Sequence, residues 1–194
     1  YIVLLNFVSK LNRQEKEETL AASFTNSQGS KMAVKRLVKD LMQLNSSKTK
    51  SGIDASPSGN DLFIWNVKFT DIPTETKLGK DLQEYAKKYE EEAVICLQML
   101  FPPDYPFSPP FIRILKPRFQ FLTGHVTLGG SICMQMLTKS GWQPCNDIES
   151  ILVQVRAEIL SDPKASLADH ETNISYSLED AKIAFQRMTK KYGW

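Results

Sequence analysis

Hydrophobic residues recur at helical spacing within residues 30–44, and the positions concerned are Val34, Leu37, Val38, Leu41 and Leu44. Side chains three and four positions apart lie on one side of an α-helix, so the pattern predicts an amphipathic helix with that side buried. Ser30 stands directly before these positions and can cap the helix, because its hydroxyl accepts a free backbone N–H. A second, more charged helix is predicted over residues 77–92.

Strand-like segments show a different pattern. Residues 61–69, 93–100 and 111–115 are rich in β-branched and aromatic residues, which favour strands. A polar stretch at residues 56–60 predicts a turn before the first of them. We therefore expect a meander of antiparallel strands.

A proline-rich segment follows the second predicted strand. Residues 101–110 contain five prolines, and each of them lacks a backbone N–H and has a fixed φ. A helix or a central strand is excluded there, so the segment predicts a rigid extended loop. Tyr105 and Phe107 are its expected anchors.

Two further helices are predicted towards the C-terminus. The first begins with Asn146 as its cap and Glu149 three residues later, and it ends at Asp162 because a proline follows. The second begins at Ser177, with acidic residues in its first turn and lysines in its last, which complements the helix dipole. Gly193 suits a left-handed terminus. Helices combined with a meander predict an α+β fold.

The N-terminal part of the chain has less pattern. Residues 1–11 form an apolar cluster with two interpretations: the end of a helix or strand from an upstream domain, or a helix that docks a partner. Residues 23–29 are polar and predict a linker. Tyr1 is not a start methionine, so we expect a piece of a longer chain, with residues 1–29 as an extension and residues 30–194 as the main domain.

The composition narrows the classes of function. The chain has 194 residues, of which 42% are hydrophobic and 24% charged, as in a globular protein. A net charge of +2 without a dense run of basic residues argues against nucleic acid as the partner, and no apolar stretch is long enough to span a membrane. The odd number of cysteines, without metal-ligand spacing, predicts a reducing compartment, the cytoplasm or the nucleus.

The candidate chemistry centres on Cys133. Gly129 and Gly130 stand before it, and without a Cβ they let backbone or a bulky partner approach the sulfur. A thiolate is a strong nucleophile at neutral pH, so an approachable cysteine can act as a covalent catalyst. Most lone cysteines are inert and buried, so the surrounding motifs decide the interpretation.

Four ordered motifs resemble those of the catalytic domain of ubiquitin-conjugating enzymes. They are the predicted strand with Trp65, Tyr-Pro-Phe-x-Pro-Pro at 105–110, Gly-Ser-Ile-Cys at 130–133 and Trp-x-Pro at 142–144. Their joint occurrence is more specific than any one of them, and the resemblance covers residues 30–194.

Finer features resemble the Q-type branch of that family, and they lie at 129–134, 137–142, 148–150 and 192–194. The resemblance implies an N-terminal helix, an antiparallel meander sheet, a catalytic extended segment and C-terminal helices. It also implies that Cys133 takes ubiquitin from the activating enzyme as a thioester and passes it to an amine or another nucleophile of a protein substrate, together with a ligase. No metal or bound cofactor is expected, because ATP is consumed upstream.

One family motif is missing. Most members carry His-Pro-Asn with the asparagine eight residues before the cysteine, and here His125 stands at that position. Its imidazole N–H can stabilise the oxyanion of the transfer step, or the ring can accept a proton. The alternative is that His125 is a surface loop residue and that backbone amides of the glycines stabilise the charge.

Three groups of residues correspond to partner surfaces in the family. Lys31, Lys35 and Lys39 form a basic stripe on the first predicted helix, where the activating enzyme docks through an acidic surface; the alternative is a solvated face. Phe107 and Pro144 match the loops that dock ligases of the RING type, with core packing as the alternative. The helical insert at 77–92 is a departure from the family and can alter partner choice.

The expected acceptor also departs from the family pattern. Gln135 replaces an acidic residue that often follows the cysteine by two, and in the loop 162–169 only Asp169 is a candidate for removing a proton from lysine. We therefore hypothesise that hydroxyls or an N-terminal amine also accept the acyl group.

Two rival interpretations remain. The domain can be a ubiquitin-binding adaptor with little transfer activity, as the missing motif suggests, or a cysteine hydrolase using Cys133 and His125, although the sequence shows no residue to orient the histidine. Cys96 is predicted to be an inert core residue and Cys145 an accessible one, while His170 is expected to face solvent.

Overall fold

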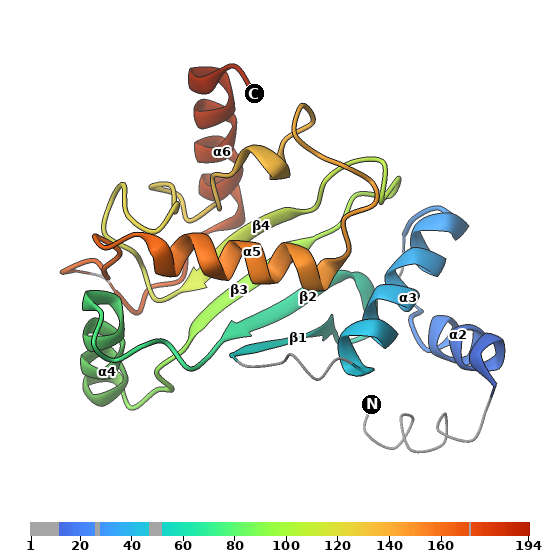
Figure 1. The fold of residues 1–194 in the computed structure, drawn as a ribbon, viewed down its shortest axis with the longest axis horizontal. Helices are drawn as coiled ribbons and strands as arrows, with labels where there is room; N and C mark the ends of the chain where they lie inside the picture. Colours follow the sequence, from blue (N-terminus) through green and yellow to red (C-terminus); the bar gives the residue numbers. More distant parts are fainter. Residues whose placement is uncertain (1–11, 26–27, 47–51, 171) are drawn as a thin grey trace.

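A computed structural model describes residues 12–25, 28–46, 52–170 and 172–194. Its centre is an antiparallel sheet with the strand order β1-β2-β3-β4. The strands are Ile53–Ser58, Asp61–Phe69, Ile95–Leu100 and Phe111–Lys116. Helix α5 (Ile148–Ser161) lies across one face of this sheet, and α3 (Lys31–Ser46) and α4 (Lys77–Tyr89) lie near opposite ends of the molecule (Figure 1). This arrangement confirms the predicted α+β fold and the meander.

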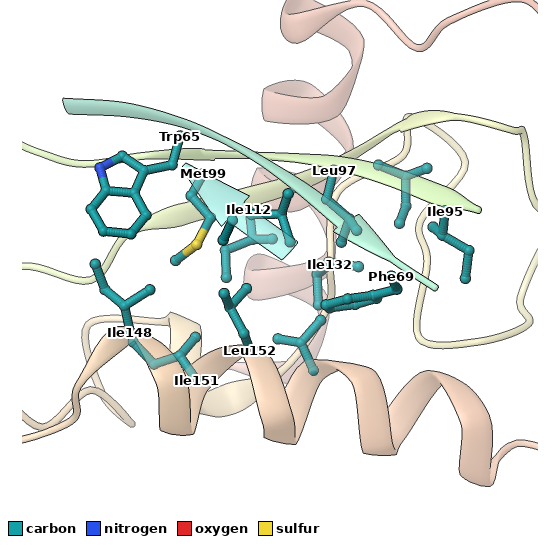
Figure 2. Packing of buried hydrophobic residues seen from close by; sticks show 14 of the residues in the cluster. Trp65, Phe69, Ile95, Leu97, Met99, Ile112, Ile132, Ile148, Ile151 and Leu152 are labelled. Carbon is teal, nitrogen blue, oxygen red and sulfur yellow. The ribbon is translucent and has the colours of Figure 1, made fainter. Parts of the chain in front are cut away.

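The hydrophobic core fills the space between the sheet and α5. Alternate residues of the strands point towards the helix, and Figure 2 shows Trp65, Phe69, Leu97 and Met99 facing its apolar side. The helix contributes Ile148, Ile151 and Leu152, all fully buried. Because α5 is amphipathic and the strands alternate, one hydrophobic layer is sufficient to hold the fold together.

Helix α6 (Leu178–Tyr192) packs on the side of β4 (Figure 1). Phe185 meets Phe111 edge-to-face, with ring centroids 5.6 Å apart. The helix begins at the predicted cap, where the Ser177 hydroxyl accepts the N–H of Asp180, and it ends at Gly193 in the left-handed conformation. The prediction of this helix is therefore confirmed at both ends.

Three boundaries differ from the prediction. Residues 56–58 belong to β1, so the turn is confined to Gly59 and Asn60; Pro57 is tolerated because β1 is an edge strand, where a missing N–H breaks no ladder. Helix α5 is capped by Asp147, whose carboxylate accepts the N–H of Ser150, and Asn146 is not the cap. Helix α4 ends earlier than predicted, because Glu90 has a left-handed conformation.

Helix α2 (Arg13–Ala22) has no counterpart in the prediction. The side chain of Asn12 caps its first turn, and Glu15 returns a hydrogen bond to the Asn12 backbone. The helix packs against α3, with Leu20 and Phe24 buried. Residues 1–11 lie outside the described residues, so both interpretations of that apolar cluster stay predictions.

The proline-rich loop is anchored by only one of its two predicted aromatic residues. Tyr105 is fully buried and donates its hydroxyl to Asp40 of α3 over 3.1 Å. Phe107 has 63% of its surface exposed, so its prediction as an anchor is wrong, and core packing does not explain it. Trp142 instead donates its indole N–H to the carbonyl oxygen of Pro106 over 2.6 Å, which ties the loop to the segment after Cys133. None of the helices in the described part of the chain has the length and apolarity required to cross a bilayer.

Candidate active site

Cys133 lies at the end of an extended segment that runs beside β4. The amide of Ile132 donates to the carbonyl of Ile112 over 3.0 Å, and Val126 and Ile132 form an isolated antiparallel bridge. These contacts close residues 125–133 into a tight loop. Cys133 is half-buried at its end, and this burial raises the pKa of its thiol above the usual range because the thiolate loses water.

A groove of about 900 Å³ opens beside the thiol, between the loop that leads to Cys133 and helix α6. Its walls are mainly apolar, and they include Phe121, Leu122, Leu128, Ile183, Met188 and Tyr192. Cys133 and His125 both line this groove. The structure thus brings together the two predicted catalytic residues, which stand eight positions apart in the chain.

His125 is held in an unusual conformation. Its φ is +58°, in the left-handed region that few residues other than glycine adopt. Its carbonyl accepts the amide N–H of Cys133 over 2.8 Å, while its Nε2 lies 3.4 Å from a carboxylate oxygen of Glu158 on α5. Within the described residues no hydrogen bond joins the imidazole to the sulfur of Cys133, so the two are linked through the backbone.

The glycines before Cys133 serve a different contact from the one predicted. A Cβ on Gly129 would collide with the carbonyl group of Asp180 and with Ala184, and one on Gly130 would collide with the ring of Tyr176. The space that their missing side chains leave is therefore filled by α6 and by the tyrosine shortly before it, and the expectation of a partner approaching there is wrong.

Asp162 is an acidic residue of this site that the sequence interpretation misses. The sequence marks it only as the end of a helix, yet its side chain lines the groove with Cys133 and His125. Asp169, the predicted acid, is exposed and lines a separate hollow beside α4. The signal for Asp162 is weak, since an Asp-Pro pair is typical of any helix end.

The predicted partner residues lie away from the groove, and they are all exposed. Lys31, Lys35 and Lys39 lie along α3, on the side where α2 packs. Phe107 and Pro144 lie in two loops that the bond from Trp142 to Pro106 joins.

The remaining singled-out residues have simpler surroundings. Cys145 and His170 are exposed, as predicted. Cys96 is half-buried, not a core residue, because it lies on β3 opposite the face that α5 covers. Among the residues described by the structure, no group of three or more His, Cys, Asp and Glu side chains has a geometry that could hold a metal ion.

Comparison with known proteins agrees with this architecture. The sequence family described as "Ubiquitin-conjugating enzyme" matches residues 36–192, which is most of the chain. The chain belongs to the ubiquitin-conjugating enzyme family. The predicted family is thereby confirmed.

The relatives that match are of the Q type. "Ubiquitin-conjugating enzyme E2 Q1" of Homo sapiens is 32% identical over 195 residues, which cover 98% of this chain and 44% of that protein. A shorter relative in Mus musculus, named as the Q-like protein 1 of the same enzyme family, is 33% identical over 138 residues, covering 69% of this chain and 81% of that protein. The chain therefore belongs to the Q-type branch, and it spans less than half the length of E2 Q1.

Proposed function

We propose that the domain is an active ubiquitin-conjugating enzyme that carries ubiquitin as a thioester on Cys133. The observation that supports this most directly is that the half-buried thiol opens into the same groove as His125, in a chain of this family. A domain that only binds ubiquitin would need no thiol at this position.

The proposed reaction has two acyl transfers. The Cys133 thiolate attacks the thioester carbonyl of ubiquitin on the activating enzyme, a new C–S bond forms, and the activating enzyme's cysteine leaves as its thiolate. A nucleophile of the substrate then attacks the new carbonyl, loses its proton, and releases the Cys133 thiolate. Negative charge develops on the carbonyl oxygen in each step, and a fixed N–H donor near it lowers the barrier. His125 is the side chain proposed for this role.

The partner surfaces follow from exposure and charge. The stripe of Lys31, Lys35 and Lys39 is proposed to meet an acidic surface of the activating enzyme, since opposite charges speed association. Phe107 is proposed as the apolar contact for a RING-type ligase, with Pro144 beside it, because a large exposed aromatic side chain is typical of an interface. A reducing compartment would keep Cys133 available for the reaction.

The direct test is to incubate the protein with activating enzyme, ATP and ubiquitin, and to run gels with and without reductant. We expect a reductant-sensitive adduct in the wild type and in Cys145→Ala, which removes an exposed thiol outside the groove. We expect none in Cys133→Ala. If no adduct forms while ubiquitin still binds, the adaptor interpretation holds and the proposal is wrong; if a related modifier charges Cys133 instead, only the cargo was misassigned.

A second proposal concerns the acceptor. The predicted acid Asp169 lies outside the groove, and the carboxylate of Asp162 inside it already accepts two backbone N–H groups, so neither is arranged to deprotonate a lysine. We propose that hydroxyls or an N-terminal amine accept the acyl group as well as lysine. The charged protein should be offered lysine, serine, threonine and a peptide with a free N-terminus; discharge by lysine alone would contradict the proposal.

A further inference from the structure

The last turn of α5 directs two carboxylates at the loop that precedes Cys133. Glu158 and Asp162 are four residues apart, so they lie on the same side of the helix end. Glu158 reaches the ring of His125, with 3.4 Å between its oxygen and Nε2. Asp162 reaches the backbone one residue earlier, where it accepts the N–H of Gly124 over 2.7 Å.

The Asp162 carboxylate is fully engaged in backbone contacts. One oxygen accepts the N–H of Gly124, and the other accepts the N–H of Lys164 over 2.8 Å. Partial burial favours the neutral acid, yet these two N–H groups and the nearby His125 outweigh it and hold the pKa of Asp162 below its usual range. The residue is therefore a charged clamp between the loop before Cys133 and the loop after α5.

This clamp holds a conformation that the chain would not adopt readily by itself. Gly124 and His125 are consecutive residues with φ near +60°. Glycine accepts such a φ at no steric cost, but a histidine does so only when its surroundings hold it there. The bond from Asp162 fixes the amide directly before His125, and the next carbonyl, that of His125, receives the amide of Cys133 over 2.8 Å.

We propose that Asp162 is a positioning residue for His125, and through the His125 carbonyl for Cys133. Helix α5 thereby transmits the rigidity of the hydrophobic core to the reacting groups, and Glu158 sets the direction of the imidazole. This inference rests on the proposed thioester function for its consequence in the reaction. Its structural half, the clamp itself, is independent of that function.

The kinetic test is a double-mutant cycle between Asp162→Asn and His125→Ala. Each variant is charged with ubiquitin, charging is stopped, and single-turnover discharge to the preferred acceptor is timed. Asparagine retains one acceptor oxygen and removes the charge, so we expect Asp162→Asn to slow discharge about tenfold or more, as misplacement of a reacting group does. In the His125→Ala background the same change should have little further effect, because Asp162 acts through His125. Equal slowing in both backgrounds, or no slowing in either, would overturn the proposal.

A structural measurement separates this proposal from the proposed function. Amide and imidazole resonances of the uncharged protein are compared between the wild type, Asp162→Asn and Asp169→Asn. We expect the Gly124 amide and the His125 ring resonances to move in Asp162→Asn and to stay in place in Asp169→Asn, an exposed acid of the same loop. Unchanged resonances in Asp162→Asn refute the clamp even if Cys133 charges normally. A wild type that shows the expected shifts but never charges refutes the proposed function alone.

Discussion

The amide N–H of Cys133 donates a hydrogen bond of 2.8 Å to the carbonyl oxygen of His125. The bond closes the loop between the two residues, and the hydroxyls of Thr127 and Ser131 meet inside it at 2.7 Å. The position of the thiol therefore depends on the backbone of His125, although the two side chains are not bonded to each other. Any change that moves this backbone is expected to move the sulfur as well.

Reversing the basic stripe should slow charging selectively. In the triple variant Lys31→Glu, Lys35→Glu and Lys39→Glu, we expect the rate of thioester formation to fall about ten- to a hundredfold, because steering towards an acidic partner is lost. Discharge of the charged protein should not change, since the stripe lies away from the groove. Both rates can be followed on gels at low and high salt.

The matched control for that variant lies on α4. Lys80, Lys87 and Lys88 are three exposed lysines of a helix at the far end of the molecule, and their reversal changes the net charge by the same amount. We expect near-normal charging from it. Equal slowing in both triple variants would show that total charge matters and that the stripe is no docking site.

Gly129→Ala should loosen α6. The added Cβ collides with the carbonyl group of Asp180 and with Ala184, both of the helix, so the helix must shift. We expect a loss of about 1–3 kcal/mol in the free energy of unfolding, which is typical of overpacking. Hydrogen exchange of residues 178–192 should accelerate while that of α3 stays unchanged. Uniform acceleration in both helices would show general destabilisation instead.

Arg36→Ala should be among the most damaging single changes. The guanidinium contacts both oxygens of the buried Asp40 at 2.9 and 3.1 Å, and it donates to the carbonyls of Pro144 and Asn146. Its removal leaves Asp40, which is only 3% exposed, without its cation, and we expect a loss of about 3–5 kcal/mol in urea unfolding. Lys35→Ala, an exposed neighbour, should change stability by less than about 0.5 kcal/mol.

The effect of Arg36→Ala should also depend on pH. Burial raises the pKa of Asp40 above its usual range, although Arg36 and Tyr105 act in the opposite direction. A carboxyl with a raised pKa in the folded state favours folding while it is neutral, and that contribution is lost as the pH rises through the folded pKa. Without Arg36 the ionised form is penalised further, so the loss of stability should be smaller near pH 4 than near pH 7. A loss that is independent of pH would contradict this account.

The uncharged enzyme should have a sluggish thiol. Burial raises the pKa of Cys133, so less thiolate is present at neutral pH than in an ordinary cysteine, whose pKa is about 8.5. Alkylation of Cys133 by iodoacetamide, followed by mass spectrometry between pH 7 and 10, should reach its midpoint above that of an unstructured cysteine peptide. A midpoint at or below that of the peptide would show that some group activates the thiol.

Much of the fold can be predicted because its signals are local. The apolar spacing on α3 and α5 and the aromatic, β-branched strands predict the elements, and Ser177 and Gly193 mark both ends of α6. Helix α2 escapes prediction, since its residues are mostly polar and its burial rests on Leu20 and the nearby Phe24. Such a helix depends on its packing against α3 more than on its own pattern.

By itself, the sequence determined the family, the candidate thiol and the unusual histidine, because these are matters of residue type and order. Only the tertiary structure decided that α6 fills the space beside Gly129 and that Phe107 is exposed. It also decided that Asp162, not Asp169, shares the groove with Cys133. These relationships join residues tens of positions apart, and spacing along a chain carries no information about which distant carboxylate or helix the packing of the core brings to a loop.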